Sequence, residues 1–330
     1  EKQTHLGFIL DSKLNFWAHI TNAITKAKKG VGLIKFMSKY VSRDVLDQFY
    51  KLYVRPHLDY GDIIYHKHDP NFSMLFTKKL DSVQYSAALA VSGAWKGTNT
   101  DKIFEELGWE TLYYRRWYRR LTHFYKIVHD NQPNYMKELL PLLKNNRYNL
   151  RNPRQFENFE VRTKRYSDSY YPYCVEQWNI LDPSIRTKPT ISQFKTEIFR
   201  IIRPPKRNIF GISDINGVRL LTRLRVDFSD LKGDKFRHNF NCNDPTCSCG
   251  TGSENVEHYL LHCPLFSEQR EVLLDSITIL IDRDARVENP YVLTQLLLYG
   301  NPDFNYRANR MIIEVTLLFI RNTRRFSGKQ

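Results

Sequence analysis

Four of the five cysteines and two of the ten histidines lie in one segment of 22 residues, 242–263. Four of these side chains follow the spacing C-x-C-x8-H-x4-C: Cys247, Cys249, His258 and Cys263. A structural Zn²⁺ takes four thiolate or imidazole ligands arranged as a tetrahedron. We therefore predict that the four residues hold one zinc ion.

The local sequence indicates how the second half of this cluster is built. Ser253 is a candidate N-cap for a short helix, on which His258 and His262 would share one face because they are four residues apart. Cys263 follows His258 by five residues, so we expect it where the helix unwinds. Pro264 supports this, because the residue before a proline is disfavoured in helical geometry.

The role of the cluster is clearer than its exact ligand set. Cys242 and His262 remain reserve ligands. Disulfides are the weaker interpretation, since no signal peptide is visible and Cys247 and Cys249 are too close to pair easily. Four protein ligands leave no open coordination position, so we expect a structural metal. A zinc hydrolase is disfavoured, because no acid–base partner for a metal-bound water stands out.

Other catalytic patterns are scarce. The sequence has no Gly-rich phosphate loop. Asp11, Asp59 and Asp62 have no partner at a recognisable metal-ligand spacing, so solvated or capping roles are predicted for them. Cys174 stands on an apolar helical face beside Trp178 and is predicted to be buried.

The charge of the chain favours an anionic partner. Its 330 residues carry 50 Lys and Arg against 35 Asp and Glu, a net charge of +15. Residues 111–165 hold 13 basic and 4 acidic residues, a net +9 interleaved with tyrosines. Such a concentration is typical of nucleic-acid binding. No window of eighteen residues lacks charge, so a membrane span is not expected.

The helix predicted over residues 112–128 carries much of this charge. Trp117, Leu121 and Phe124 form its apolar stripe, with Arg115, Arg119 and Lys126 on the opposite side. We predict phosphate contacts from five side chains: Arg115, Arg116, Arg119, Arg120 and Lys126. The alternative is an ordinary solvated face.

Apolar periodicity predicts a mainly helical chain. An initial buried strand is expected over residues 5–10, and residues 145–169 are expected to be a surface loop or linker. Pro204 and Pro205 indicate a second boundary. Helices are predicted over residues 16–36, 43–54, 72–95, 101–107, 112–128, 173–180, 192–202, 218–226, 268–281, 291–299 and 307–325.

Several blocks resemble, in order, the C-terminal part of non-LTR (LINE, jockey-like) retrotransposon reverse transcriptases. The first is HLGFILDSKLNFWAHI, where the palm of that family ends and the thumb begins. The others are YKLYVRPHLDYGDIIYH, LDSVQYSAALAVSGAW, LGWETLYYRRWYRRLTHFYKI, FKTEIFR with LLTRLRVDFSDL, and CSCG…HYLLHCP, which is similar to the family's CCHC motif. Cys242 departs from the family pattern, because an Asp is frequent at that position.

The resemblance implies a helical thumb-like bundle followed by a helical C-terminal region with a small CCHC zinc module. Five parts are expected: 1–13, the end of the palm; 14–145, the thumb-like domain; 146–240, a linker and helical connector; 241–270, the zinc module; and 271–330, C-terminal helices. The family's paired aspartates, which hold two Mg²⁺, are not in the sequence. We therefore expect a part of a longer protein that does not polymerise alone.

The implied function is to hold RNA and DNA. The thumb would grip the template–primer, the zinc module would bind the element's RNA or the target DNA, and the upstream palm and fingers would be partners. An intracellular location, in cytoplasm and nucleus, is expected from the resemblance. The alternative is a degenerate or co-opted copy that serves as a zinc-stabilised protein-interaction scaffold.

Overall fold

The computed structural model describes residues 2–66, 70–129, 132–144, 155–202 and 211–327. These residues are mainly helical, as the sequence predicts. The chain forms two compact units, each assembled from three segments. The first contains Glu1–Val31, Lys51–Tyr85 and Trp109–Pro204, and the second contains Gly32–Tyr50, Ser86–Gly108 and Pro205–Gln330. The division falls within the helices α1 (Trp17–Met37) and α5 (Pro70–Ser92).

The N-terminus is a β-hairpin rather than the predicted single strand. β1 (Lys2–His5) pairs antiparallel with β2 (Phe8–Asp11). Leu6 and Gly7, at φ values of 48° and 80°, form the two-residue turn. Positive φ at both positions suits a tight hairpin. The prediction missed the turn because the apolar run 5–10 continues through it.

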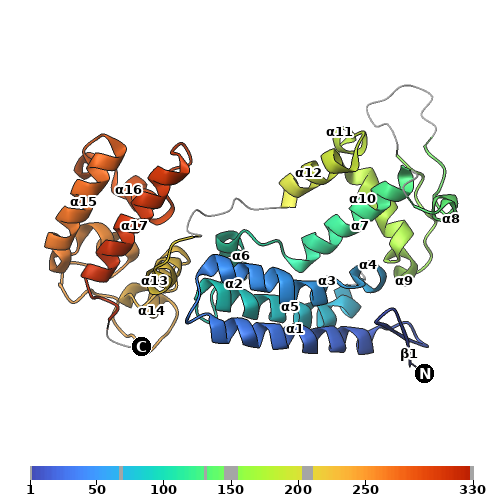
Figure 1. Cartoon of the computed structure of the whole chain (residues 1–330), viewed down its shortest axis with the longest axis horizontal. Helices are drawn as coiled ribbons and strands as arrows, with labels where there is room; N and C mark the ends of the chain where they lie inside the picture. The colour runs from blue at the N-terminus through green and yellow to red at the C-terminus, as the bar shows by residue number, and fades with distance from the viewer. Residues whose placement is uncertain (1, 67–69, 130–131, 145–154, 203–210, 328–330) are drawn as a thin grey trace. The chain divides into compact units, whose positions relative to one another are not determined.

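The first unit is built around α7 (Leu112–Val128), which packs against α10 (Tyr170–Ile180) and α12 (Ile191–Ile202) (Figure 1). Phe124, Trp178 and Phe194 are fully buried between them. The remaining elements of this unit are the π-turn η1 (Tyr50–Val54), α3 (Arg55–Asp59), α4 (Asp62–Tyr65), α8 (Asn134–Glu138), α9 (Lys164–Ser167) and α11 (Pro183–Arg186). Thr111 caps α7, its side chain accepting from the amide of Tyr114.

The predicted linker is partly packed structure. Residues 145–154 lie outside the described residues, and so do Pro204 and Pro205. Phe156, however, is 5% exposed and meets Phe124 edge to face at 6.0 Å. Asp168, which follows α9, is also buried. Residues 157, 158, 160–164 and 166 are exposed, as expected of a surface loop, whereas Phe156 and Asp168 are packed inside. Isolated residues of a segment without periodicity can therefore still be buried.

The second unit has its own hydrophobic core. α15 (Ser267–Ile281) and α16 (Pro290–Tyr299) pack against α17 (Tyr306–Asn322), which also contacts α13 (Ile215–Arg225) (Figure 1). Its other elements are α2 (Arg43–Phe49), α6 (Thr100–Leu107), α14 (Lys232–Arg237), the π-helix η2 (His258–His262), and the 3₁₀ turns η3 (Pro264–Phe266) and η4 (Ala285–Val287). The same core contains Tyr259 and Leu260 from the cysteine-rich segment.

A buried ion triad joins three segments of this second unit. The Glu106 carboxylate accepts from Arg43 at 2.9 Å and from Arg225 at 2.8 Å. Each side chain is at most 4% exposed. Burial alone would raise the pKa of Glu106, but the two guanidinium groups outweigh it and hold the pKa below its usual value.

In the described part of the chain, no helix is both long and apolar enough to cross a membrane.

Candidate metal centre

Cys247 and Cys249 lie in a tight turn between two short bridged segments. Thr246 pairs with Ser253 as an antiparallel bridge, and the Cys247 amide donates to the Gly252 carbonyl at 2.8 Å. Gly250 closes the turn at φ 79° by donating to the Cys247 carbonyl at 2.9 Å. This left-handed conformation favours glycine, as expected from its position after Cys249. Both sulfurs consequently come from the same turn.

His258 and Cys263 come from a π-helical turn. Asn255, not Ser253, caps it, because the Asn255 side chain accepts from the His258 amide at 2.8 Å. The Cys263 amide then donates to the His258 carbonyl, five residues back, at 2.7 Å. The wider π turn brings positions five apart onto one side, which an α-helix would not do. Cys263 itself is extended at φ −65° and ψ 117°, as Pro264 after it requires.

The four predicted ligands converge on one point. The ligand atoms of Cys247, Cys249, His258 and Cys263 all lie within 4.8 Å of one another. The Cys247 and Cys263 sulfurs are 3.7 Å apart, and the Cys249 sulfur is 3.3 Å from His258 Nε2. Tetrahedral zinc with Zn–S bonds of about 2.3 Å separates two sulfurs by about 3.8 Å. The donor set and its spacing therefore fit a four-coordinate metal ion such as Zn²⁺.

The electrostatics of the thiols differ with their surroundings. Hydrogen bonding by Thr251, with smaller contributions from Cys247 and His258, lowers the pKa of Cys249 to about 6. Burial raises the pKa of Cys263 to about 12. A bound cation stabilises thiolates and reverses the effect of burial. Metal binding at this site would therefore release protons and weaken as the pH falls.

The two reserve ligands lie outside the cluster. The Cys242 thiol donates to the backbone carbonyls of Lys232 and Asp244, at 3.6 and 3.2 Å. His262 is half exposed, and its Nε2 lies 3.5 Å from a Glu257 carboxylate oxygen. Among the described residues, the group of side chains that could hold a metal consists of the four predicted ligands, without Cys242 or His262.

The centre is anchored to the core on both sides. Arg270 donates to the carbonyls of Leu260 and Cys263, at 3.0 and 2.5 Å. Glu254 is 3% exposed, and its carboxylate accepts hydrogen bonds from the Arg325 guanidinium and the Lys232 amide, at 2.6 to 2.8 Å. A helix capped by Ser253 would have placed Glu254 in its first turn. Its role as a clamp depends on Arg325, 71 residues away, and no local pattern indicates it.

Most arginines of the predicted cationic face of α7 form contacts within the first unit. Asp59 binds Arg115 through both carboxylate oxygens, at 2.6 and 2.8 Å. Arg119 pairs with Asp62 at 3.0 Å and lies 3.7 Å from Asp59. The prediction that Asp59 and Asp62 are solvated or capping residues is wrong, because they are the counter-ions of these arginines.

Two further arginines of the helix are buried. Arg116 is 3% exposed and lies over the Tyr65 ring, and Arg120 is 2% exposed. Arg120 donates to the Ile63 and His66 carbonyls. In this conformation neither can contact a phosphate. A single apolar stripe was the wrong pattern for α7, because α4 packs against it as well as α10 and α12. Lys126 remains partly exposed, as does Arg119.

Comparison with protein-family models, with curated proteins and with solved structures gave no match for this chain.

Proposed function

We propose that this chain is a zinc-stabilised nucleic-acid-binding segment of a non-LTR retrotransposon reverse transcriptase, from the end of the palm through the thumb to the CCHC motif. The observation that carries the proposal is the convergence of Cys247, Cys249, His258 and Cys263 on one metal-sized point. The helical fold and the net charge of +15 agree with it. The metal's chemistry would be structural, because four protein ligands leave no position for a substrate.

The surface beside the metal centre offers contacts for a nucleic acid strand. α14 and the turn after it expose the rings of Phe236 and Phe240, at 46% and 43%. Lys235 and Arg237 flank them, with side chains 34% and 55% exposed. Each lies beside an aspartate, Lys235 at 2.8 Å and Arg237 at 3.7 Å, but keeps an exposed surface. Cations meet phosphates and aromatic faces stack on bases, a combination that suits single strands.

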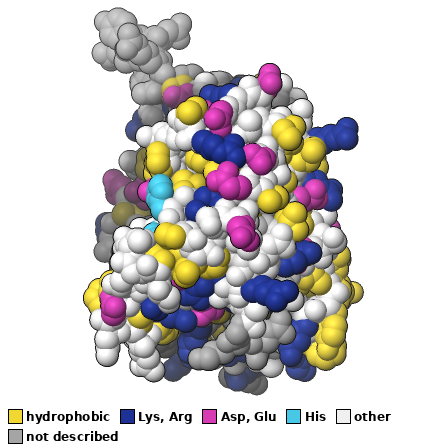
Figure 2. Space-filling view, turned by 90° about the vertical axis from the view of Figure 1, so that its left-hand side faces the viewer, with side chains coloured by type: hydrophobic (Ala, Val, Ile, Leu, Met, Phe, Trp, Pro, Cys, Tyr) yellow, Lys and Arg dark blue, Asp and Glu magenta, His cyan; other side chains and the backbone are white. Residues whose placement is uncertain are grey.

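The cysteine-rich turn supports this surface directly. Lys232, at the start of α14, donates from Nζ to the Thr246 carbonyl at 3.0 Å, and the Gly233 amide donates to the Glu254 carbonyl at 3.0 Å. A metal that orders the turn would therefore order α14 as well. On the face shown in Figure 2, by contrast, basic side chains are interspersed with acidic and hydrophobic ones.

Salt dependence tests the proposal. Affinity for a 20-base-pair RNA–DNA hybrid and for single-stranded RNA is measured by fluorescence anisotropy at several salt concentrations. Each neutralised duplex phosphate contributes about 0.9 to the slope of log affinity against log salt. A triple alanine variant at Lys126, Lys235 and Arg237 should flatten that slope by up to about 2.7.

A matched variant controls for the loss of three charges. Arg200, Arg283 and Arg310 are exposed and each pairs with a nearby glutamate. Their triple alanine variant should keep the wild-type slope. Equal slopes in all three proteins would remove the test cations from the interface. A chain that holds zinc but ignores both nucleic acids at low salt would favour the protein-interaction scaffold instead.

A further inference from the structure

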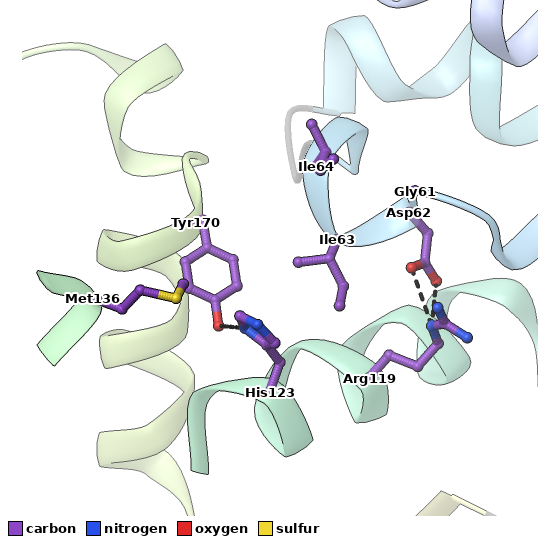
Figure 3. Close-up of a pocket in the computed structure, with 8 residues that line it drawn as sticks. All are labelled: Gly61, Asp62, Ile63, Ile64, Arg119, His123, Met136 and Tyr170. Atoms are coloured by element: carbon purple, nitrogen blue, oxygen red, sulfur yellow. Dashed lines mark hydrogen bonds and ion pairs between the residues drawn. The ribbon is translucent and has the colours of Figure 1, made fainter. Parts of the chain in front are cut away.

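A pocket of about 530 Å³ lies within the first unit, between α4, α7, α8 and α10 (Figure 3). Its volume is in the range of sites that bind small molecules. Ile63, Ile64 and Met136 supply its apolar surface. These aliphatic side chains, with the adaptable thioether of Met136, contact the flat face of a ring without fixing its orientation. The orientation must therefore come from the polar side chains.

His123 and Tyr170 point toward each other from facing helices (Figure 3). The Tyr170 oxygen lies 2.6 Å from His123 Nδ1. Burial raises the pKa of Tyr170, while burial and Lys126 lower the pKa of His123, so both are neutral at pH 7. With the Tyr170 hydroxyl donating to Nδ1, the ring carries its hydrogen on Nε2. His123 is then a hydrogen-bond donor.

Arg119 supplies a second donor. Asp62, whose side chain is 1% exposed, holds the guanidinium by its Nε at 3.0 Å (Figure 3). Among the described residues no hydrogen bond engages Nη2, and the Arg119 side chain is 34% exposed. The anchored guanidinium therefore has a fixed direction and spare hydrogens.

The two donors stand on the same side of α7. Arg119 and His123 are four residues apart, so their Cβ atoms are about 6 Å from each other on one helical face. The Asp62 carboxylate pairs with Arg119 and its side chain is 1% exposed, so its oxygens are not accessible to a ligand as acceptors. The pocket thus suits a flat ligand with an apolar face and two neighbouring acceptors on one edge.

We propose that this pocket binds a guanine base of an unpaired nucleic acid strand, with Arg119 and His123 donating to the base edge. Guanine presents two acceptors, O6 and N7, on one edge, whereas adenine and cytosine present a donor there. An unpaired strand is required, because a stacked duplex does not release the base. This inference rests on the proposed nucleic-acid function and adds a base preference to it.

Calorimetric titration of the whole, zinc-replete chain with GMP tests the inference, with AMP as the control of equal charge. GMP should bind more tightly by about 5- to 150-fold, the discrimination typical of a good two-donor contact to a base. Ile64→Trp should fill the pocket and weaken GMP binding at least tenfold. Ile64 is 58% exposed, so this change spares the core.

Two more variants localise the contact. Arg119→Gln should also weaken GMP binding at least tenfold, whereas Arg200→Ala, at an exposed arginine outside the pocket lining, should leave it unchanged. The inference would be overturned if GMP did not bind at millimolar concentration or if AMP bound equally well. It would also be overturned if the pocket bound octanoate and not GMP. Hybrid binding measured on the same sample separates the two proposals. If the hybrid binds and GMP does not, the pocket assignment alone fails; if neither binds, the proposed function fails as well.

Discussion

Removal of the metal should loosen the cysteine-rich turn without unfolding the second unit. Leu260, on the π-turn between two ligands, is fully buried, which contributes about 1.5–3 kcal/mol. Tyr259 is also buried and bonds Thr323 at 2.7 Å. These contacts hold the π-turn against the core without a metal. The bridged turn around Cys247 and Gly250 is held by hydrogen bonds at its ends, at Thr246 and Glu254, and contributes no residue to the apolar core cluster of the unit, so its tip depends on the ion.

The size of the effect follows from mass action. A ligand that binds the folded state alone stabilises it by about 4 kcal/mol when its free concentration is a thousand times Kd. A chelator should therefore lower the free energy of unfolding of the second unit by about this amount. Hydrogen exchange should rise in residues 246–253, while α15 to α17 keep their protection.

Matched cysteine variants make the experiment specific. Metal analysis should find one zinc per chain in the wild type and in Cys242→Ser, because Cys242 bonds backbone carbonyls outside the cluster. Cys263→Ser should lose the zinc. Cys249→Ser provides a second test at a partly exposed site, where misfolding is less of a concern. A chain without stoichiometric zinc, or whose stability and exchange ignore the chelator, would refute the reasoning.

Three further perturbations test the packing. Glu106→Gln should lower the free energy of unfolding by about 3–5 kcal/mol in urea titrations, since it leaves two buried guanidinium groups without their counter-ion. The same change at exposed Glu176 should cost less than about 0.5 kcal/mol. Phe156→Ala should cost about 3–5 kcal/mol, and a value near zero would restore the linker interpretation. Burial raises the pKa of Asp62 from 3.8 to about 6 despite Arg119. The folded state thus holds this proton more tightly than the unfolded state, and the associated stability is lost as the pH rises through 6. Relative to Asp62→Asn, the wild type should lose about 2.4 kcal/mol between pH 4 and pH 7, and a difference independent of pH would contradict the buried position.

Local patterns predicted the helices well. α7 spans Leu112–Val128 in the structure, the range predicted from its apolar spacing, and Thr111 caps it. α6 ends at Leu107, as predicted, and Gly108 after it adopts the left-handed conformation that closes a helix. Capping, periodicity and the conformational freedom of glycine act over a few residues, so their effects can be predicted from the sequence. The hairpin turn at Leu6 is the exception, since an apolar run concealed it.

The ion-pair partners and the burial of the charged side chains could not be predicted in the same way. Arg115 pairs with Asp59, 56 residues away in the sequence, and Glu106 pairs with Arg225, 119 residues away. Helical periodicity says which residues share a face, but not how many neighbours a helix will have. α7 is packed on several sides. Arginines that were expected on its exposed face therefore form contacts inside the unit.

By itself, the sequence determined the metal-ligand types, their spacing and most helical segments, because each follows from chemistry within a short stretch. Only the tertiary structure decided that a π-turn brings Cys263 close to His258 and that the Cys242 thiol bonds backbone carbonyls outside the cluster. It also decided which arginine side chains are buried and which are exposed. Those outcomes depend on packing between distant segments, where the cost of burying a charge is met by a counter-ion that no local pattern reveals.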